Sequence, residues 1–444
     1  LVPWHKQQAE REKTGLDLLN FDQGGLVYQP LIGLHRDVGE IDFVSMYPSI
    51  MVRCNISPEC TPNGLNDPPI NEPGLIPQTL APLLKKRIAL KHRLVETPPW
   101  DPRLKLDKAR SLAHKWLLVT CFGYLGYKNA RFGRIESHEA VTFNGREALL
   151  RAKEAAEDCE FNILQMYVDG LWVQKPGATS PRDYDRLLDE IAQRTGLSIA
   201  LDGIYRWVAF LPARRDKRMP VPNRYFGVFQ DGSIKIRGIE ARRHDTPRFI
   251  SESQMEALRW LAQAPSVDEL PQYIPGALEL LRRRLHLLRD GQAPLDQLVL
   301  GQRLSRELDL YVTPSPAARA AMQLREIGKL LGPGQKVRYL LVRSEAGVHA
   351  WDLPHRPDPR LIDQAAYRVL FLRAARTILQ PFGFQPEEVA DILDKAATQP
   401  ELDLQVRVET VPVIAGKAIL SSMRSAGGRS FDRNNSYSCN AVEH

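Results

Sequence analysis

Two apolar runs joined by Asp169-Gly170 occupy residues 162–174. An Asp-Gly pair between apolar runs is the strongest short-range signal for a β-hairpin. The segment therefore predicts two adjacent antiparallel strands with the carboxylate of Asp169 at the turn between them. Forming the turn is by itself a sufficient reason for this pair, so any chemical use of Asp169 depends on what lies near it.

A second carboxylate stands at the end of another predicted strand. Residues 24–48 alternate turn residues with short apolar runs, as strands around a hairpin do. Within this stretch Asp42 is followed by Phe-Val-Ser-Met-Tyr-Pro-Ser-Ile, which predicts a tight turn directly after the strand. An Asp in this position usually serves only the turn, so further motifs are needed to give it a chemical role.

Helices are predicted in most of the remaining chain. In residues 79–96, Arg87 and Lys91 are four residues apart and share one helix face. In residues 104–126, Lys115, Val119 and Phe122 share a face in the same way. Basic residues on a helix are most often simply solvated, so this spacing alone is weak support for a binding site. The other predicted elements are a loop at 57–78, helices at 138–158 and 183–195, strands at 204–211 and 223–239, and an Arg-rich helical region from about residue 252 with a strand pair near 336–351.

Length and charge set broad limits on the protein. A chain of 444 residues predicts more than one core, because single domains seldom exceed about 250–300 residues. A net charge of +7 suits a polyanionic partner without requiring one. The five cysteines lack the spacing of a metal site. No run of about 18 apolar residues is present, so we expect no membrane span and a cytoplasmic location.

Six segments, in order, resemble the motifs of family B DNA polymerases. The segment from Asp42 to Ile50 resembles motif A, and Arg87 with Lys91 matches the Arg-x-x-x-Lys pair of the fingers. Residues 115–127 resemble motif B, although Val119 replaces its Asn. Residues 167–171 resemble motif C. Residues 223–227 and 237–247 are similar to the Lys-Lys-x-Tyr and Lys-Gly-x-Glu…Arg-Arg-Asp elements.

The resemblance implies an α+β fold, the right-hand polymerase, with an antiparallel-sheet palm, two-helix fingers and a largely helical thumb. The implied division is 1–75 for the first part of the palm with motif A, 76–130 for the fingers with motif B, 131–248 for the second part of the palm with motif C, 249–422 for the thumb and 423–444 for a loose tail.

Motif C admits two alignments. Matching Tyr167-Val168-Asp169 to the family's Tyr-x-Asp puts Leu171 where the second Asp of Asp-Thr-Asp would bind metal, which makes Leu171 a degenerate position. A shift of two residues puts Asp169 at that second place instead, because side chains alternate along a strand with a period of two. Both alignments leave motif C one carboxylate short, and the resemblance suggests Asp202 as a substitute.

The resemblance also implies template-directed DNA synthesis, in which a dNTP is joined to a primer 3′-hydroxyl with Mg²⁺ or Mn²⁺. Tyr47 is implied to stack under the incoming sugar and to reject a ribose hydroxyl. The implied catalytic residues are Asp42 and Asp169, and the implied metal ligands are Asp42, Asp169 and Asp202. The residues implied to contact the dNTP are Ser45, Met46, Tyr47, Arg87, Lys91, Lys115 and Val119. Those implied to contact primer–template DNA are Arg224, Tyr225, Arg237, Gly238 and Arg243.

The altered motifs B and C resemble those of the divergent second archaeal group and its bacterial relatives, and they leave two functions open. One is a polymerase weakened by its degenerate motif C, and the alternative is a catalytically inactive DNA-binding or scaffold subunit. Because the match begins near residue 24, we expect no exonuclease domain in this chain. A separate chain that supplies amino-terminal or exonuclease functions is left open, as is the choice between replication and repair. A nucleoid-associated location in the cytoplasm follows from such a substrate.

Overall fold

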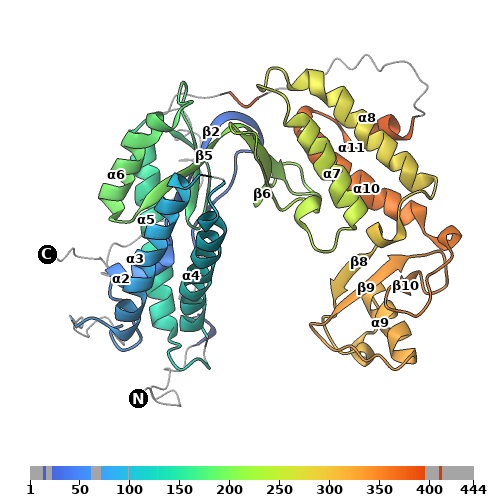
Figure 1. The fold of residues 1–444 in the computed structure, drawn as a ribbon, viewed down its shortest axis with the longest axis horizontal. Helices are drawn as coiled ribbons and strands as arrows, with labels where there is room; N and C mark the ends of the chain where they lie inside the picture. Colours follow the sequence, from blue (N-terminus) through green and yellow to red (C-terminus); the bar gives the residue numbers. More distant parts are fainter. Residues whose placement is uncertain are drawn as a thin grey trace. The chain divides into compact units, whose positions relative to one another are not determined.

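The computed structural model describes residues 14–16, 23–61, 72–98, 100–127, 129–395 and 410–412. The chain forms two compact units (Figure 1). Unit 1 comprises Leu1–Pro30, Gly39–Ile204 and Val413–His444, and unit 2 comprises Leu31–Val38 and Tyr205–Pro412. Each unit has its own hydrophobic core, which confirms the expectation of more than one. The tail predicted at residues 423–444 lies outside the described residues.

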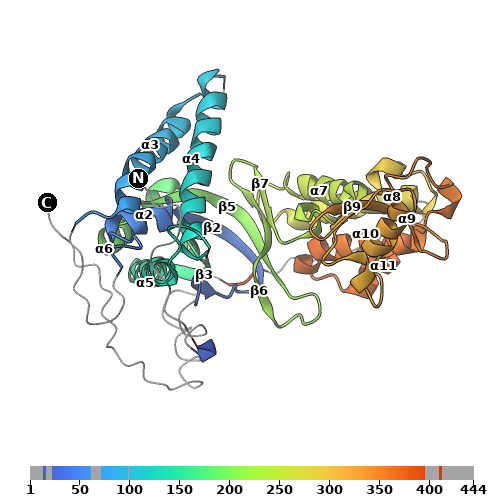
Figure 2. The same ribbon diagram turned by 90° about the horizontal axis from the view of Figure 1, so that it is seen from below.

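Unit 1 combines a sheet with a group of helices. Its strands lie in the order β1-β3-β4-β2-β5, where β1 is Val27–Tyr28, β3 is Asn162–Tyr167, β4 is Gly170–Gln174, and β2 (Gly33–Phe43) and β5 (Ile199–Pro212) each contribute one part. Its helices are α2 (Met46–Arg53), α3 (Leu75–Glu96), α4 (Arg103–Leu125), α5 (Ile135–Asp158) and α6 (Asp185–Thr195), with the short 3-10 helix η1 (Pro181–Tyr184) before α6. The long helices α3 and α4 lie side by side (Figure 2).

The hairpin predicted at residues 162–174 is confirmed as β3 and β4. The strands are antiparallel, with Met166 opposite Leu171 and Tyr167 opposite Gly170. The turn is made by Val168, whose φ is 59°, and Asp169, whose backbone N–H donates to the Tyr167 carbonyl at 2.7 Å. Gly170 is therefore the first residue of β4, and the turn lies one position earlier than an Asp169-Gly170 turn would.

The tight turn predicted after Asp42 is present at Val44 and Ser45, and the chain then enters α2, a helix that was not predicted. Ser45 takes a left-handed backbone conformation, with φ 55°, and the helix begins at Met46. Pro48 is tolerated because it lies in the first turn, where a backbone N–H would have no partner within the helix. Helix α3 likewise begins at Leu75, inside the loop predicted at 57–78. The first residues of α2 and α3 show little of the apolar spacing of 3.6 residues from which helices are predicted.

The core of unit 1 lies against one face of its sheet. Ile41 and Phe43 of β2 are buried in the same cluster as Leu171 and Val173 of β4, together with alanines and Leu149 of α5. Side chains alternate between the two faces of a strand. The side chain of Asp42, between Ile41 and Phe43, therefore points to the face opposite this core.

A close approach to β2 gives a test of this packing. A Cβ at Gly39 would lie 2.2 Å from Cε1 of Tyr184, which is fully buried. We expect Gly39→Ala to lower the free energy of unfolding by about 1–3 kcal/mol, as overpacking does. Gly123→Ala in α4 is the matched control, because its Cβ meets nothing within 4 Å, and it should raise stability by about 0.5–1 kcal/mol. Urea denaturation measures both, and an unchanged midpoint for Gly39→Ala would contradict the packing of Tyr184.

Unit 2 contains the other parts of β2 and β5 with β6 (Pro220–Phe229) and β7 (Ile234–Arg237), in the order β2-β5-β6-β7. The pairs β5–β6 and β6–β7 are antiparallel. A second, antiparallel sheet has the order β10-β9-β8 and packs against α9. The remaining elements are α7 (Arg248–Leu261), α8 (Leu270–Arg289), β8 (Leu300–Arg303), α9 (Pro316–Glu326), β9 (Lys336–Leu341), β10 (Val348–Ala350), α10 (Gln364–Leu379), α11 (Pro386–Asp394) and the 3-10 helices η2 (Glu240–Arg242), η3 (Leu295–Gln297), η4 (Leu308–Leu310), η5 (Pro359–Leu361) and η6 (Gln380–Phe382).

The predicted elements of unit 2 are present with adjusted bounds. The strand pair near 336–351 is confirmed as β9 and β10, and the helical region begins at Arg248. The segment 223–239 is two strands rather than one, because a turn containing Gly232 at φ 83° divides it. Among the described residues, no helix has both the length and the apolar composition to cross a membrane.

Candidate active site

Strand pairing in unit 1 brings Asp42 and Asp169 together. The backbone N–H of Phe43 donates to the Asp169 carbonyl at 2.9 Å, which holds the end of β2 against the β3–β4 turn. A Cβ at Gly170 would lie 3.6 Å from Oδ1 of Asp42, so that carboxylate lies beside the start of β4. Of the two residues predicted to be catalytic, Asp42 thus lies near the end of β2, and Asp169 lies in the turn that leads into the neighbouring strand β4.

Two further carboxylates surround this pair. Burial, followed by the charges of Asp169 and Asp202, raises the pKa of Asp42 to about 8. Burial also raises the pKa of Asp169, and Asp202 contributes to that rise. Glu40, which is buried and stands two residues before Asp42, adds a smaller upward effect on Asp42. Glu40 was not predicted to belong to the site. Its spacing of two residues from Asp42 on one strand could have indicated that the two side chains share a face of the sheet.

The carboxylates of Asp42 and Asp169 are oxygen ligands of the kind that divalent metal ions bind. Within the described residues, no group of three or more His, Cys, Asp or Glu side chains is arranged to hold a metal ion. Mg²⁺ does not need such a cage, because it is usually bound by one or two carboxylates together with substrate phosphates. The repulsion between Asp42 and its neighbouring carboxylates is also what a cation would relieve. Asp42 and Asp169 therefore fit Mg²⁺ or Mn²⁺ held jointly with a phosphate-bearing substrate.

Positive charge faces the carboxylates from α3 and α4. The charge of Lys91 on α3 lowers the pKa of both Asp42 and Asp169, and the charge of Lys115 on α4 lowers the pKa of Asp169. Both ammonium groups are therefore within electrostatic range of the site. Lys115 is exposed and Lys91 is partly exposed, so both can be reached by an anionic ligand.

Arg87 is almost fully buried and is occupied by the protein itself. Its Nε donates to Oγ of Ser45 at 2.8 Å, and its Nη1 donates to the carbonyl of Ser111 at 2.8 Å. Burial lowers the pKa of Arg87, which the nearby charge of Asp42 partly offsets. These contacts join the turn after Asp42 to α3 and α4. The expected direct contact of Arg87 with a dNTP does not fit this arrangement, and in this conformation Arg87 is a positioning residue.

Tyr47 is held by close packing beside the same turn. Its ring centroid lies 4.4 Å from that of Phe122 on α4, and the Phe122 ring stacks on His138 at 4.5 Å. A Cβ at Gly145 would lie 2.9 Å from Cε1 of Tyr47. Such contacts fix the direction of the Tyr47 side chain, as a residue that limits the shape of a ligand requires.

The other residues implied to contact a nucleotide differ in their exposure. The side chain of Met46 belongs to the buried core, so only its backbone is in a position to meet a ligand. Val119 is 46% exposed on α4 and presents methyl groups rather than a hydrogen-bond donor. Ser45 is occupied as the acceptor for Arg87.

Leu171 does not fit the metal-ligand position that one alignment of motif C gives it. Leu171 has no exposed surface and lies in the core cluster with Ile41 and Phe43, on the face opposite the Asp42 side chain. Asp169, in contrast, raises the pKa of Asp42 by its charge. This burial fits the second alignment of motif C, in which Asp169 takes the place of the second metal-binding Asp, and that alignment stays a prediction.

The residues implied to contact DNA lie in unit 2 and divide into two groups. Arg224 is buried and donates to the Pro212 carbonyl and to Oγ1 of Thr377, and Tyr225 is only 1% exposed. These environments do not fit a contact with DNA phosphates, so the expectation for Arg224 and Tyr225 is corrected to a structural role. Arg237 is partly exposed and Arg243 exposed.

Gly238 has a purely steric role in the backbone. Its φ is 61°, and a Cβ there would lie 2.7 Å from the Asn223 carbonyl oxygen. Only glycine adopts this conformation without strain and also leaves room for that oxygen.

Comparison with known proteins shows what the chain is similar to. The family model described as DNA polymerase family B matches residues 66–172, which include α3, α4, β3 and the start of β4. The expected resemblance to family B DNA polymerases is thereby confirmed. DNA polymerase 2 of Aeropyrum pernix is 28% identical over 377 residues, which are 81% of this chain and 45% of that protein. DNA polymerase 2 of Saccharolobus solfataricus is 30% identical over 61% of this chain and 40% of its own length.

A solved structure gives the same result for the fold. The family B DNA polymerase from Pyrobaculum calidifontis matches 86% of this chain and 49% of its own, with 28% identity and a TM-score of 0.56. The mixture of helices and antiparallel sheet is thus similar to that of a family B polymerase. The chain spans about half the length of the relatives that it matches.

Proposed function

We propose that this chain acts as the polymerizing part of a family B DNA polymerase, adding dNTPs to the 3′-hydroxyl of a primer on a DNA template. The observation that carries the proposal is that Asp42, near the end of β2, lies against the turn that holds Asp169, and that Lys91 and Lys115 are within electrostatic range. Carboxylates facing cations across one site are the arrangement that nucleotidyl transfer needs.

Each group has a distinct part in this proposal. Asp42 and Asp169 hold Mg²⁺ or Mn²⁺, which when bound stabilises the charge that develops on the transferred phosphoryl group. Asp202 lies near enough to support them by its charge. Lys91 and Lys115 bind the triphosphate and stabilise the negative charge that leaves with pyrophosphate. Arg87 keeps the Ser45 turn in register with α3 and α4.

The right-hand layout is part of the same proposal. Residues 1–75 and 131–248 are assigned to the palm, 76–130 with α3 and α4 to the fingers, and 249–422 to the thumb. The partners are then primer–template DNA and dNTPs, and a separate chain is a candidate source of amino-terminal or exonuclease functions. A DNA substrate of this kind places the protein with the nucleoid in the cytoplasm.

A second candidate function is a DNA-binding subunit without catalysis. It is favoured by Val119, whose exposed methyl groups stand where motif B of the family has a hydrogen-bonding Asn. Leu171 no longer supports this alternative, because it belongs to the core.

Primer extension by the purified chain separates the two candidates. The proposed polymerase extends a primer with Mg²⁺, or with Mn²⁺, which accepts a wider range of ligand sets. A chain that binds primer–template but does not extend it with either ion would be the non-catalytic subunit. A chain that binds DNA no better than a control protein of equal charge would contradict both functions.

Tyr47→Ala is expected to relax the choice of sugar. The packed Tyr47 ring is proposed to exclude a ribose 2′-hydroxyl, so its removal should increase incorporation of ribonucleotides relative to dNTPs by about tenfold or more, the effect of removing about 1.4 kcal/mol of discrimination. Single-nucleotide kinetics with matched rNTP and dNTP measure the ratio. Incorporation of dNTPs by the same variant is the control, and an unchanged ratio would remove Tyr47 from sugar selection.

A further inference from the structure

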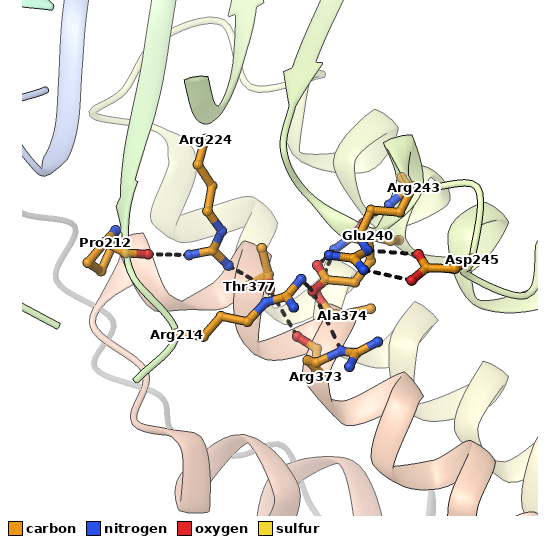
Figure 3. Close-up of polar contacts among 11 residues, drawn as sticks. Pro212, Arg214, Arg224, Glu240, Arg243, Asp245, Arg373, Ala374 and Thr377 are labelled. Atoms are coloured by element: carbon orange, nitrogen blue, oxygen red, sulfur yellow. Dashed lines mark hydrogen bonds and ion pairs between the residues drawn. The ribbon is translucent and has the colours of Figure 1, made fainter. Parts of the chain in front are cut away.

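Four arginines lie near two carboxylates in unit 2, and Figure 3 shows three of them in the group around these carboxylates while Arg224 points to Pro212 and Thr377. Arg214 follows β5, Arg224 lies on β6, Arg243 follows η2, and Arg373 lies on α10. The carboxylates belong to Glu240, at the start of η2, and to Asp245 (Figure 3). The sequence analysis did not single out Arg214 or Arg373, since they are 159 positions apart and match no motif.

The pairing within this arginine cluster is uneven. Arg243 has its own partner, because its Nε and Nη2 donate to the two oxygens of Asp245 at 2.8 and 2.6 Å. Glu240, which has no exposed surface, accepts from Nη2 of Arg214 at 2.7 Å. Nε of Arg373 lies 3.8 Å from the same oxygen of Glu240, beyond hydrogen-bond distance. That nitrogen is buried and has no hydrogen-bond partner.

Arg224 adds charge without adding an acceptor. It is 7% exposed, and its guanidinium donates to the neutral oxygens of Pro212 and Thr377. Arg214, Arg224, Arg243 and Arg373 are therefore four cations near two carboxylates, those of Glu240 and Asp245. Burial lowers the pKa of Arg373, and the like charges of Arg214 and Arg243 lower it further, against the opposing charges of Glu240 and Asp245. A buried excess of positive charge is unfavourable unless an anion compensates it.

We propose that Arg214 and Arg373 form a phosphate-binding site whose ligand is a phosphodiester group of the DNA backbone. This inference rests on the proposed function. The side chains of Arg214 and Arg373 are 36% and 41% exposed, so both reach solvent. Glu240 and Arg224, which lie beside them, are buried. Planar guanidinium groups match the oxygens of a phosphate and donate two hydrogen bonds at once.

The loop that carries Arg214 supports this assignment independently. It continues through Arg215, Lys217 and Arg218, all of which are exposed. Lys217 Nζ donates to Oε1 of Gln385 at 2.6 Å, which ties the loop to the residues before α11. The loop thus presents further cations next to Arg214, as a surface that follows a polyanionic backbone would.

The test compares two arginines on the same helix. Arg373→Gln should weaken binding of primer–template DNA about tenfold or more, the effect of losing a charge-assisted hydrogen bond. It should also make the log–log salt dependence shallower by about 0.9, the value for one phosphate contact. Arg368→Gln is the matched control, because Arg368 also lies on α10, is 39% exposed and has Asp394 as its own partner. It removes the same charge and should change affinity less than about twofold.

Each outcome decides one part of the inference. Equal weakening by Arg373→Gln and Arg368→Gln would reduce the effect to net charge and overturn the site, while the proposed function stands. Failure of the unaltered chain to bind DNA would overturn the proposed function itself. If Arg373→Gln does not fold, Arg373→Lys keeps the charge, and the site predicts weaker binding with an unchanged salt slope. A third outcome is that inorganic phosphate stabilises the unaltered chain but not Arg373→Gln, while the two proteins bind DNA equally well. That outcome would assign the site to free phosphate instead.

Discussion

Asp42→Asn is expected to reduce primer extension by about 10²–10³-fold or more, while primer–template binding changes less than about twofold. Removal of one preorganised electrostatic group at a reacting centre has an effect of this size. Asn keeps the shape of the side chain but supplies no negative charge for Mg²⁺, and Asp169 would then be the main carboxylate left at the metal. Binding should persist because the DNA contacts proposed here lie in unit 2, away from this residue in the sequence.

Asp37→Asn is the control for this experiment. It changes the same residue type on the same strand, and the φ of 51° at Asp37 is one that Asn adopts readily. Single-turnover extension and fluorescence anisotropy with labelled primer–template measure the two properties separately. Extension by Asp42→Asn at the unaltered rate would sink the proposed active site. A joint loss of extension and of DNA binding would instead indicate a loss of fold.

Leu171→Asp is expected to destabilise the protein by about 4 kcal/mol or more and to give no gain in extension. The substitution removes a fully buried leucine from the core of unit 1 and puts a carboxyl group among apolar side chains. Loss of the packing alone costs about 2–5 kcal/mol, and an unpaired buried polar group adds to that. Because whole domains are stable by only about 5–15 kcal/mol, much of the variant should be unfolded.

Leu171→Met tests the same position without a charge. A volume-conserving apolar exchange should cost less than about 1.5 kcal/mol and leave extension unchanged. Urea denaturation followed by tryptophan fluorescence gives the stabilities, and extension is compared per folded molecule. A Leu171→Asp variant that is stable and extends primers faster would reinstate the alignment of motif C that places a missing ligand at Leu171.

Local signals in the sequence were enough for the hairpin at 162–174 and for the carboxylate that ends β2, because turn chemistry and alternation act over a few residues. The alignment of motif C was not decidable in this way. It depends on the fact that Leu171 faces the same core as Ile41 and Phe43, residues about 130 positions earlier. Helix α2 was missed for a different reason, since a left-handed Ser45 and Pro48 resemble a turn until the rest of the helix is known.

The residues implied to contact DNA show the same limit. Arg224 and Arg243 stand in segments that read alike, with basic residues beside aromatic or turn residues. The guanidinium of Arg224 is buried and donates to a carbonyl and to a threonine, whereas that of Arg243 is exposed beside Asp245. Arg224 is buried partly because it contacts Thr377 on α10. The sequence pattern of residues 220–247 contains no information about the packing of α10.

Arg87 gives the active site a mechanical property. One guanidinium holds both the hydroxyl of Ser45 and the carbonyl of Ser111, so the turn behind Asp42 and helix α4 cannot separate without breaking one of these hydrogen bonds. A ligand that displaces α3 or α4 must therefore also pull on the strand end that carries the carboxylate. The position of a ligand bound at Lys91 and Lys115 is therefore coupled to the position of Asp42 through the hydrogen bonds of Arg87.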